Sequence, residues 1–477
     1  MKKYLPVFLA LLLLSACNHE GNTPSPDAIT AFMNGGQFQA AEKMIRQYIA
    51  VTSLTPEEKL RWEWEIDRMQ RISLDFNKSE TQALKYIKQY FPGVTAEQIN
   101  AWEDSGALEC MVIDGEKRYF SRALRNLFRI DSTCRAKFEE VNGPAEDVKA
   151  PFLKEHLPEI VRLTKEKGTV RVEPVTYTIT YTLTVPANTV PEGETIRAWM
   201  PLPRTDVPRQ SGFRLLSASE PDYIISPDNY VHKSIYMEKT AVKNQDAVFE
   251  YTFTYTAQAQ YHHFDPLKEV LPYNTDSPLY KEYIKAAPPH ILTGGSVAEL
   301  AKKIVGREEN PFLQLQKIFT YISETYPWAG AREYSTIESI PLYVLENGHG
   351  DCGQVSLLFI SMCRSLGIPA RWESGWMLHP GEVNLHDWAE AYLEGIGWIP
   401  VDQSFGLQPG PVCLFYLRGM DSYRMAVNTG IGGSFFPAKV YPRSETVDFQ
   451  RGEVEWRGGN LYFNRWDYRL KVHPSGR

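Results

Sequence analysis

The sequence predicts an α+β protein with an amino-terminal helical domain, a small β-sandwich-like domain and a third domain of mixed helices and strands. Three observations support this class. The chain has 477 residues, whereas single hydrophobic cores stop growing at roughly 250–300 residues. Its apolar periodicity changes from helical to strand spacing after Gly168. Helical spacing resumes near Val297, and no repeat of fixed period is evident.

The composition is that of an ordinary globular protein. Hydrophobic residues make up 43%, aromatic residues 12% and charged residues 23%, which excludes disordered, collagen-like and disulfide-dense classes. Lysine and arginine number 51 against 58 acidic residues, a net charge of -7. Such a chain lacks the positive surface that binds a phosphate backbone, so we expect no nucleic-acid partner.

The first residues have the layout of a secretory signal. Lys2 and Lys3 precede an apolar run from Leu5 to Leu14, which is too short to span a bilayer. The ending Leu14-Ser15-Ala16-Cys17 resembles the bacterial lipobox, and this resemblance implies cleavage after residue 16 and a lipid on Cys17. We therefore expect a signal peptide at 1–16, a polar tether at 17–26 and a lipid anchor in the cell envelope, preferentially in the outer membrane.

The remaining cysteines bear on the compartment and on reactivity. They are Cys110, Cys134, Cys352, Cys363 and Cys413. An odd number in an oxidising compartment leaves at least one thiol outside any intramolecular disulfide. Cys110 and Cys134 either pair or stay reduced, which spacing alone leaves open.

Residues 27–167 form the predicted helical domain. Apolar residues recur at three- and four-residue steps from Phe32 to Tyr48, and Thr55 and Thr95 each open a capped helix. Cys110–Phe120 is predicted to be a hairpin turning at Asp114-Gly115. We assign this domain a structural role.

Residues 172–258 form the predicted β-sandwich-like domain. Apolar and threonine residues alternate from Val175 to Val185, and aromatic residues alternate again from Phe249 to Tyr255. At the other end of the chain, 431–477 is predicted to supply closing strands that pack back on the body.

Residues 259–430 form the predicted third domain, in which helices are expected at Val297–Ile304 and Phe312–Ile322. His262 and His263 are adjacent there, but neighbours in sequence rarely face one ligand, and the chain has no HExxH or CxxC spacing. We therefore expect no metal and no cofactor.

Cys352 lies at the start of a strongly predicted helix. Apolar residues from Val355 to Leu366 define one buried stripe, which Gly367 ends, and Cys352 continues that stripe at the amino end. The helix dipole and unpaired backbone N–H groups there favour a thiolate and lower the pKa of a thiol. Cys352 is thus a candidate nucleophile. The alternative is a buried structural cysteine, an interpretation that suits Cys363.

A candidate base and acid follow on a predicted hairpin. His386 lies on its first strand and Asp402 directly after its second, with Gly395-Ile396-Gly397 between the strands. Cysteine, histidine and acid in this chain order are typical of papain-like nucleophile sites. His386 and Asp402 share a face only if the loop is odd or a bulge intervenes. Asp387 competes for the role of orienting the imidazole, but neighbouring strand residues point to opposite faces.

These motifs together resemble the transglutaminase-like superfamily. The matching features are a cysteine that begins a helix, the strand His386-Asp387-Trp388-Ala389-Glu390 and the segment Gly397-Trp398-Ile399-Pro400-Val401-Asp402, with a helix-to-strand corner at Leu366–Arg371. The resemblance covers about 295–410 and implies a papain-like α+β catalytic core. It further implies Cys352 as nucleophile, His386 as general base and then acid, and Asp402 as the residue that orients the imidazole.

Other residues near these motifs are assigned more general roles. Trp328 and Gln354 are alternative second donors to an oxyanion, beside the backbone N–H of Cys352. Asp351 is expected to cap the helix. His349 and His379 fall in predicted loops and are taken as bystanders, and Trp376 and Trp388 line either the cleft or the core.

The expected function is that of a cysteine hydrolase or acyltransferase that acts on peptide or protein amides of the cell envelope through a thioester. Hydrolysis is favoured over deamidation and acyl transfer because it needs only water. One alternative is a non-catalytic envelope lipoprotein that binds peptide or glycan. Another is an adhesion or assembly factor in which the thiol is incidental.

Overall fold

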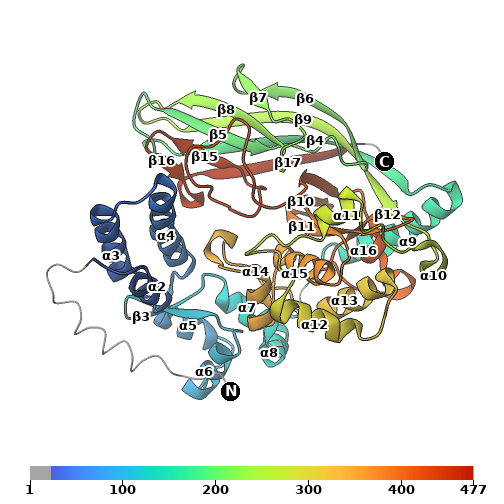
Figure 1. Ribbon diagram of the computed structural model, residues 1–477, viewed down its shortest axis with the longest axis horizontal. Helices are drawn as coiled ribbons and strands as arrows, with labels where there is room; N and C mark the ends of the chain where they lie inside the picture. Colours follow the sequence, from blue (N-terminus) through green and yellow to red (C-terminus); the bar gives the residue numbers. More distant parts are fainter. Residues whose placement is uncertain (1–22, 145, 476–477) are drawn as a thin grey trace. The chain divides into compact units, whose positions relative to one another are not determined.

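The computed structural model describes residues 23–144 and 146–475 (Figure 1). The predicted signal peptide and Cys17 lie outside these residues. The described chain divides into two compact units: 23–85 with 109–121, and 86–108 with 122–475. No helix within the described ranges is long and apolar enough to cross a membrane.

The first unit combines helices with a small antiparallel sheet in the order β1-β3-β2. Its elements are α2 (Pro26–Asn34), α3 (Phe38–Val51), α4 (Pro56–Asp75), β1 (Lys78–Ser79), β2 (Cys110–Ile113) and β3 (Glu116–Tyr119). Thr55 caps α4 in a reciprocal pair of hydrogen bonds with Glu58, and Asp114 and Gly115 turn the hairpin with φ of 48° and 84°. The predicted cap and hairpin are both confirmed.

Helices continue from the boundary between the units into the second unit. They are α5 (Glu80–Ile87), α6 (Ala96–Asp104), α7 (Ala123–Ile130), α8 (Ser132–Asn142) and α9 (Ala150–Lys167). Thr95 caps α6 as predicted. Gly168 ends α9 in the left-handed conformation, and the first long strand follows.

Two five-stranded sheets in the second unit enclose an aromatic core. The first has the order β13-β9-β4-β17, with β6 also paired to β9, and the second has the order β16-β15-β5-β8-β7. The strands are β4 (Arg171–Val185), β5 (Thr195–Pro201), β6 (Gln210–Ala218), β7 (Tyr223–Ile225), β8 (Ser234–Thr240), β9 (Ala247–Tyr261), β13 (Gly419–Met420), β15 (Glu453–Trp456), β16 (Gly459–Leu461) and β17 (Asp467–Ser475). The carboxy-terminal strands therefore join both sheets.

The alternation in β4 and β9 explains how these two strands pair. Buried aromatic and aliphatic residues point to the core, where the Tyr177 and Tyr255 rings stack at 5.4 Å. On the other face, Thr176 and Thr256 are joined by a hydroxyl hydrogen bond of 2.8 Å. One register therefore satisfies both faces, as expected for an antiparallel pair.

A third sheet, in the order β12-β11-β10-β14, carries the candidate site. It comprises β10 (Ala370–His379), β11 (Glu382–Leu393), β12 (Gly397–Val401) and β14 (Arg424–Asn428), accompanied by α10 (Pro266–Glu269), α11 (Pro278–Tyr283), α12 (Gly295–Val305), α13 (Pro311–Thr325), α14 (Ile340–Asn347), α15 (Cys352–Ser365) and α16 (Phe415–Arg418). Both helices expected before Cys352 are present as α12 and α13, and the predicted α+β class is confirmed.

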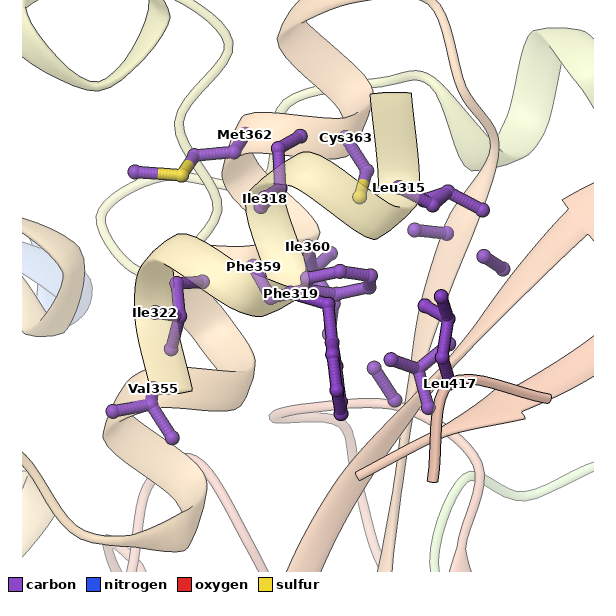
Figure 2. Packing of buried hydrophobic residues seen from close by; sticks show 14 of the residues in the cluster. Leu315, Ile318, Phe319, Ile322, Val355, Phe359, Ile360, Met362, Cys363 and Leu417 are labelled. Carbon is purple, nitrogen blue, oxygen red and sulfur yellow. The ribbon is translucent and has the colours of Figure 1, made fainter. Parts of the chain in front are cut away.

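The central helix of this domain is α15. It contacts α12, α13 and α14 as well as β10 and β11, and its residues from Gly353 to Cys363 are all buried. Figure 2 shows Val355, Phe359 and Cys363 packed with apolar side chains of α13. The structural interpretation of Cys363 is thereby confirmed, and the start of α15 is held in a rigid core.

Candidate active site

The helix that begins with Cys352 is held by a cap that the sequence predicted. The side chain of Asp351 accepts a hydrogen bond from the Gln354 N–H at 3.0 Å, and the Gln354 side chain accepts one from the Asp351 N–H at 3.0 Å. Gly353, the residue after Cys352, leaves no room for a side chain, because a Cβ there would lie 2.2 Å from the hydroxyl of Tyr334. These contacts place Cys352 at the first turn of a buried helix.

His386 and Asp402 lie on one face of the hairpin formed by β11 and β12. Leu393 is paired with Gly397, so three residues form the loop, and a loop of odd length brings the two side chains to the same face. His386 Nε2 lies 2.7 Å from Asp402 Oδ2. The structure therefore brings the predicted imidazole and carboxylate into direct hydrogen bonding.

Asp402 is held ionised by its surroundings. Arg424 Nη2 donates to Oδ2 at 3.0 Å, and the Phe405 N–H donates to Oδ1 at 3.1 Å. Burial alone raises the pKa of a carboxyl, but His386 and Arg424 outweigh it and lower the pKa of Asp402 to about 2. An ionised carboxylate only accepts hydrogen bonds, so Nε2 of His386 carries the proton and its Nδ1 keeps a free lone pair.

Burial also sets the state of the imidazole. It lowers the pKa of His386 below its usual value, although Asp402 opposes this shift. His386 is therefore neutral at pH 7 and can accept a proton at Nδ1.

The thiol of Cys352 faces a different carboxyl. Its Sγ donates to Asp387 Oδ2 at 3.3 Å, and Gln450 donates to Oδ1 of that group at 2.6 Å. No hydrogen bond joins Cys352 to His386 in the described ranges 23–144 and 146–475. Asp402 is thus the carboxylate bound to the imidazole, as expected, and Asp387 on the opposite strand face interacts with the thiol.

The expectation that the helix terminus lowers the thiol pKa is wrong. Desolvation raises the pKa of Cys352 well above its usual value, and the negative charges of Asp387 and Asp351 raise it further. The helix dipole is a weaker effect than two nearby carboxyls in a poorly solvated site. The resting pair consists of a neutral thiol and a neutral imidazole.

Two cavities meet at Cys352. The larger, of about 920 Å³, is lined by Cys352, His386 and Trp328 together with Leu153 of α9. The smaller, of about 200 Å³, is lined by Cys352, Trp328 and Asp387. The thiol therefore has access to open space on the side of the base and on the side of Asp387.

The other residues singled out from the sequence differ in whether they border the cavities or lie in the core. Trp328 is 43% exposed and lines both cavities, whereas Gln354 is buried and lines neither. Trp376 stacks on Tyr181 in the sandwich core, and Trp388 is buried with its indole donating to Glu373 at 2.7 Å. Both of these tryptophans belong to the core and not to the cleft.

His349 and His379, which the sequence placed in loops as bystanders, are both buried, and the expected loop position is wrong for His379. His349 lies in the short segment before α15. His379 is the last residue of β10 and not a loop residue. Its Nε2 lies 3.2 Å from Asp421, so it joins a charged cluster behind the site.

Sequence reasoning named His379 and Asp402 but missed the other members of this charged cluster. Arg424 lies between two carboxylates, at 3.0 Å from Asp402 and 3.6 Å from Asp421, and Tyr416 donates to Asp421 at 2.9 Å. Arg424 begins β14, which exists only because it pairs with β10 about 50 residues earlier. The available signal was a short apolar alternation after Asp421, too weak to identify a strand. No set of three or more His, Cys, Asp or Glu side chains within the described ranges could hold a metal ion.

Comparison with known proteins agrees with this geometry. Residues 298–403 match the Transglutaminase-like superfamily. A protein of Haemophilus influenzae, named only as uncharacterized, is 27% identical over 261 residues, which span 48% of this chain and 68% of that protein.

Two solved structures are similar at low sequence identity. A chain from Cytophaga hutchinsonii, provisionally named as a cysteine protease, is 15% identical with a TM-score of 0.43, and the match covers 64% of this chain and 93% of that one. The periplasmic domain of TgpA from Pseudomonas aeruginosa is 12% identical with a TM-score of 0.26, over 52% and 91% of the two chains. The region that carries Cys352, His386 and Asp402 is a transglutaminase-like domain at residues 298–403.

Proposed function

We propose that this protein is a cysteine enzyme that acts on peptide or protein amide bonds through a thioester on Cys352. The observation that supports this best is the shared cavity, because Cys352 and His386 line the same space of about 920 Å³. His386 is also oriented there by an ionised carboxylate at 2.7 Å. Cys352, His386 and Asp402 are the proposed catalytic residues.

The reaction begins from the neutral pair. The thiol leaves its hydrogen bond with Asp387 and transfers its proton to Nδ1 of His386 as Sγ attacks the amide carbon. The resulting imidazolium is stabilised by Asp402 and donates that proton to the departing amine, so that the C–N bond breaks and a thioester remains. Water then attacks the thioester, with His386 as base, and releases a carboxylic acid and the thiol.

The oxyanion of the tetrahedral intermediate needs two donors. One is the backbone N–H of Cys352, which has no acceptor within the helix because it lies in the first turn. For the other we favour Trp328 over Gln354, since the indole borders the cavity. The Gln354 side chain is buried and lines neither cavity, and its Oε1 is engaged in the helix cap.

Hydrolysis is the proposed outcome, with deamidation and acyl transfer as the related possibilities for the same thioester. Hydrolysis needs only water as the second substrate. Acyl transfer also needs an amine site from which water is excluded.

A non-catalytic binding role is the second candidate. The observation in its favour is the thiol itself, which donates to Asp387 and has a raised pKa. A protein that retains this cavity without turnover would bind a peptide or glycan in the same space.

The test is a comparison of wild type with Cys352→Ala on a mixture of unfolded proteins, followed by mass spectrometry. New peptide termini, deamidated glutamine or incorporation of an added primary amine distinguish the three reactions. Cys413→Ala is the matched control, because Cys413 is also a half-buried free thiol but does not line either cavity. Products that persist in Cys352→Ala, or their absence from wild type, contradict the enzyme proposal.

The envelope location and the lipid anchor are also part of the proposal. Their support is the sequence of the first 17 residues, with paired lysines, an apolar run and Ser15-Ala16-Cys17. Replacing Cys17 with serine should move the protein from the membrane fraction to the soluble fraction. Retention of Cys17→Ser on membranes contradicts the anchor.

A further inference from the structure

A row of arginines lies along α7, outside the segment that matches the superfamily. Arg122 directly precedes the helix, and Arg125 and Arg129 follow at helical spacing that puts all three on one side. All three side chains are exposed. We call Arg122, Arg125 and Arg129 the arginine stripe.

The arginine stripe is tied to the loop that carries Trp328. The buried side chain of Asn126 donates to the Gly330 carbonyl at 2.9 Å and accepts from the Gly330 N–H at 2.9 Å. A Cβ on Gly330 would lie 2.7 Å from Cδ of Arg122, so the arginine packs directly over this glycine. The helix is therefore fixed against the candidate site by paired hydrogen bonds and close packing.

Both ends of the stripe reach the cavities that meet at the thiol. Arg129 lines the larger cavity with Cys352 and His386, and its guanidinium lies 4.6 Å from the centre of the Trp328 ring. Arg122 lines the smaller cavity with Cys352. A group bound along the stripe would thus lie beside the nucleophile.

The arginine stripe lacks ion pairs within the described residues, although burial raises the pKa of Asp351 and the charge of Arg122 opposes that rise. None of the three arginines forms an ion pair with a carboxylate anywhere in the described part of the chain. The carboxylates on the wall of the larger cavity, Asp147 and Glu382, are both paired with Lys149. Like charges held together without a counterion cost stability. Desolvation lowers the pKa of Arg129, and the charges of Arg125 and Arg122 lower it further.

We propose that the arginine stripe binds carboxylates of an acidic peptide substrate and thereby places a neighbouring amide at Cys352. This inference rests on the proposed function and adds the substrate class. Arginine suits the role because its guanidinium forms paired hydrogen bonds with a carboxylate. A protein of net charge -7 repels acidic peptides in general, so a local site of opposite sign selects where they bind.

The test measures binding without turnover, so that its outcome does not depend on the catalytic proposal. The protein carries Cys352→Ala, and the probe is a fluorescent decapeptide with a central glutamine flanked by glutamates. A second peptide has glutamine in place of every glutamate. We expect the acidic peptide to bind about tenfold tighter, and Arg129→Gln to remove most of that difference.

Two controls sharpen the test. Arg214→Gln removes an exposed arginine of β6 that borders neither cavity, and it should leave both affinities unchanged. Raising the salt from about 50 to 300 mM should weaken the acidic peptide more than the neutral one. Equal affinities for the two peptides would overturn the proposal. The proposal would also be overturned if the protein bound vesicles of anionic lipid, lost that binding in Arg129→Gln, and showed no preference for the acidic peptide.

Discussion

Asp402 and Asp387 are both buried aspartates within hydrogen-bonding distance of a candidate catalytic side chain, yet their pKa values move in opposite directions. Burial raises the pKa of Asp402, but His386 and Arg424 outweigh it and lower that pKa to about 2. Burial raises the pKa of Asp387 well above its usual value, and Asp448 and Asp351 raise it further. Asp387 has no ion pair with a cation among the described residues. The difference teaches that a neighbouring cation, and not burial alone, decides in which direction the pKa of a buried acid moves.

This contrast assigns separate roles to the two faces of β11. The face with His386 meets a stable negative charge, which suits an imidazole that must become positive. The face with Asp387 meets the thiol, where a negative charge opposes ionisation of Cys352. The following changes test this contrast, from the largest expected effect to the smallest.

Asp402→Asn removes the charge that stabilises the imidazolium. We expect acylation of Cys352 by p-nitrophenyl acetate to slow by about 10³-fold, because the base loses both its orientation and its counterion. The measurement is the rate of p-nitrophenol release. Asp276→Asn, which changes an exposed carboxylate, should leave the rate unchanged. A loss of less than about tenfold would show that Asp402 does not act through His386.

Arg424→Met removes the cation between two carboxylates. We expect a loss of about 3–5 kcal/mol in the free energy of unfolding, because Asp402 and Asp421 are left buried without their partner. Urea unfolding at pH 7 measures this loss, with Arg214→Met as the control.

The acid range gives a further check of Arg424. The lowered pKa of Asp402 contributes stability that is present above about pH 4 and is lost as the pH falls through about 2. The difference between wild type and Arg424→Met should therefore shrink in acid. A constant difference from pH 7 to pH 2 would contradict the assigned pKa.

Glu445→Gln tests an acid of the Asp387 type. Burial and the nearby Glu333 raise the pKa of Glu445 to about 8, so the folded protein loses stability as the pH rises from about 4.5 through 8. The glutamine can keep the acceptor for the Val447 N–H. We expect the variant to exceed wild type by about 1–3 kcal/mol at pH 9 and to equal it near pH 4. Urea unfolding at both values checks this, and an advantage of equal size at both would contradict it.

Asp387→Asn removes the charge beside the thiol. We expect the pH midpoint for alkylation of Cys352 by iodoacetamide to fall by about one unit, which makes alkylation about tenfold faster below the midpoint. Site-resolved mass spectrometry gives the rate, with Cys413 in the same sample as the internal reference. An unchanged midpoint would mean that Asp387 does not control the thiol.

Much of the fold was predictable because its signals are local. The caps at Thr55, Thr95 and Asp351 and the hairpin turn at Asp114-Gly115 each depend on residues within one turn of chain. Long segments in which apolar and polar residues alternate strictly, such as β4, can also be predicted as strands from the sequence. Short strands such as β14 do not, since a five-residue segment becomes a strand only by pairing with a distant one.

Candidate residues were found by motif, whereas their environment was not. The order of Cys352, His386 and Asp402 is a property of the sequence, which left open whether the imidazole and carboxylate share a face. The pairing of Leu393 with Gly397 decided that they do. The partners Arg424 and Asp421 come from a later segment, and Asn126 of α7 docks on Gly330 across about 200 residues.

The sequence by itself determined the α+β class, the helix that begins at Cys352 and the hairpin on which His386 lies, because helix caps and side-chain periodicity act over short stretches of chain. Only the tertiary structure decided the ionisation of these groups. A pKa depends on burial and on charges within a few ångströms, and for this site the charges of Arg424 and Asp387 come from other elements than the groups they act on. Tertiary packing therefore joined Asp402 to Arg424 and made the thiol of Cys352 a neutral donor to Asp387.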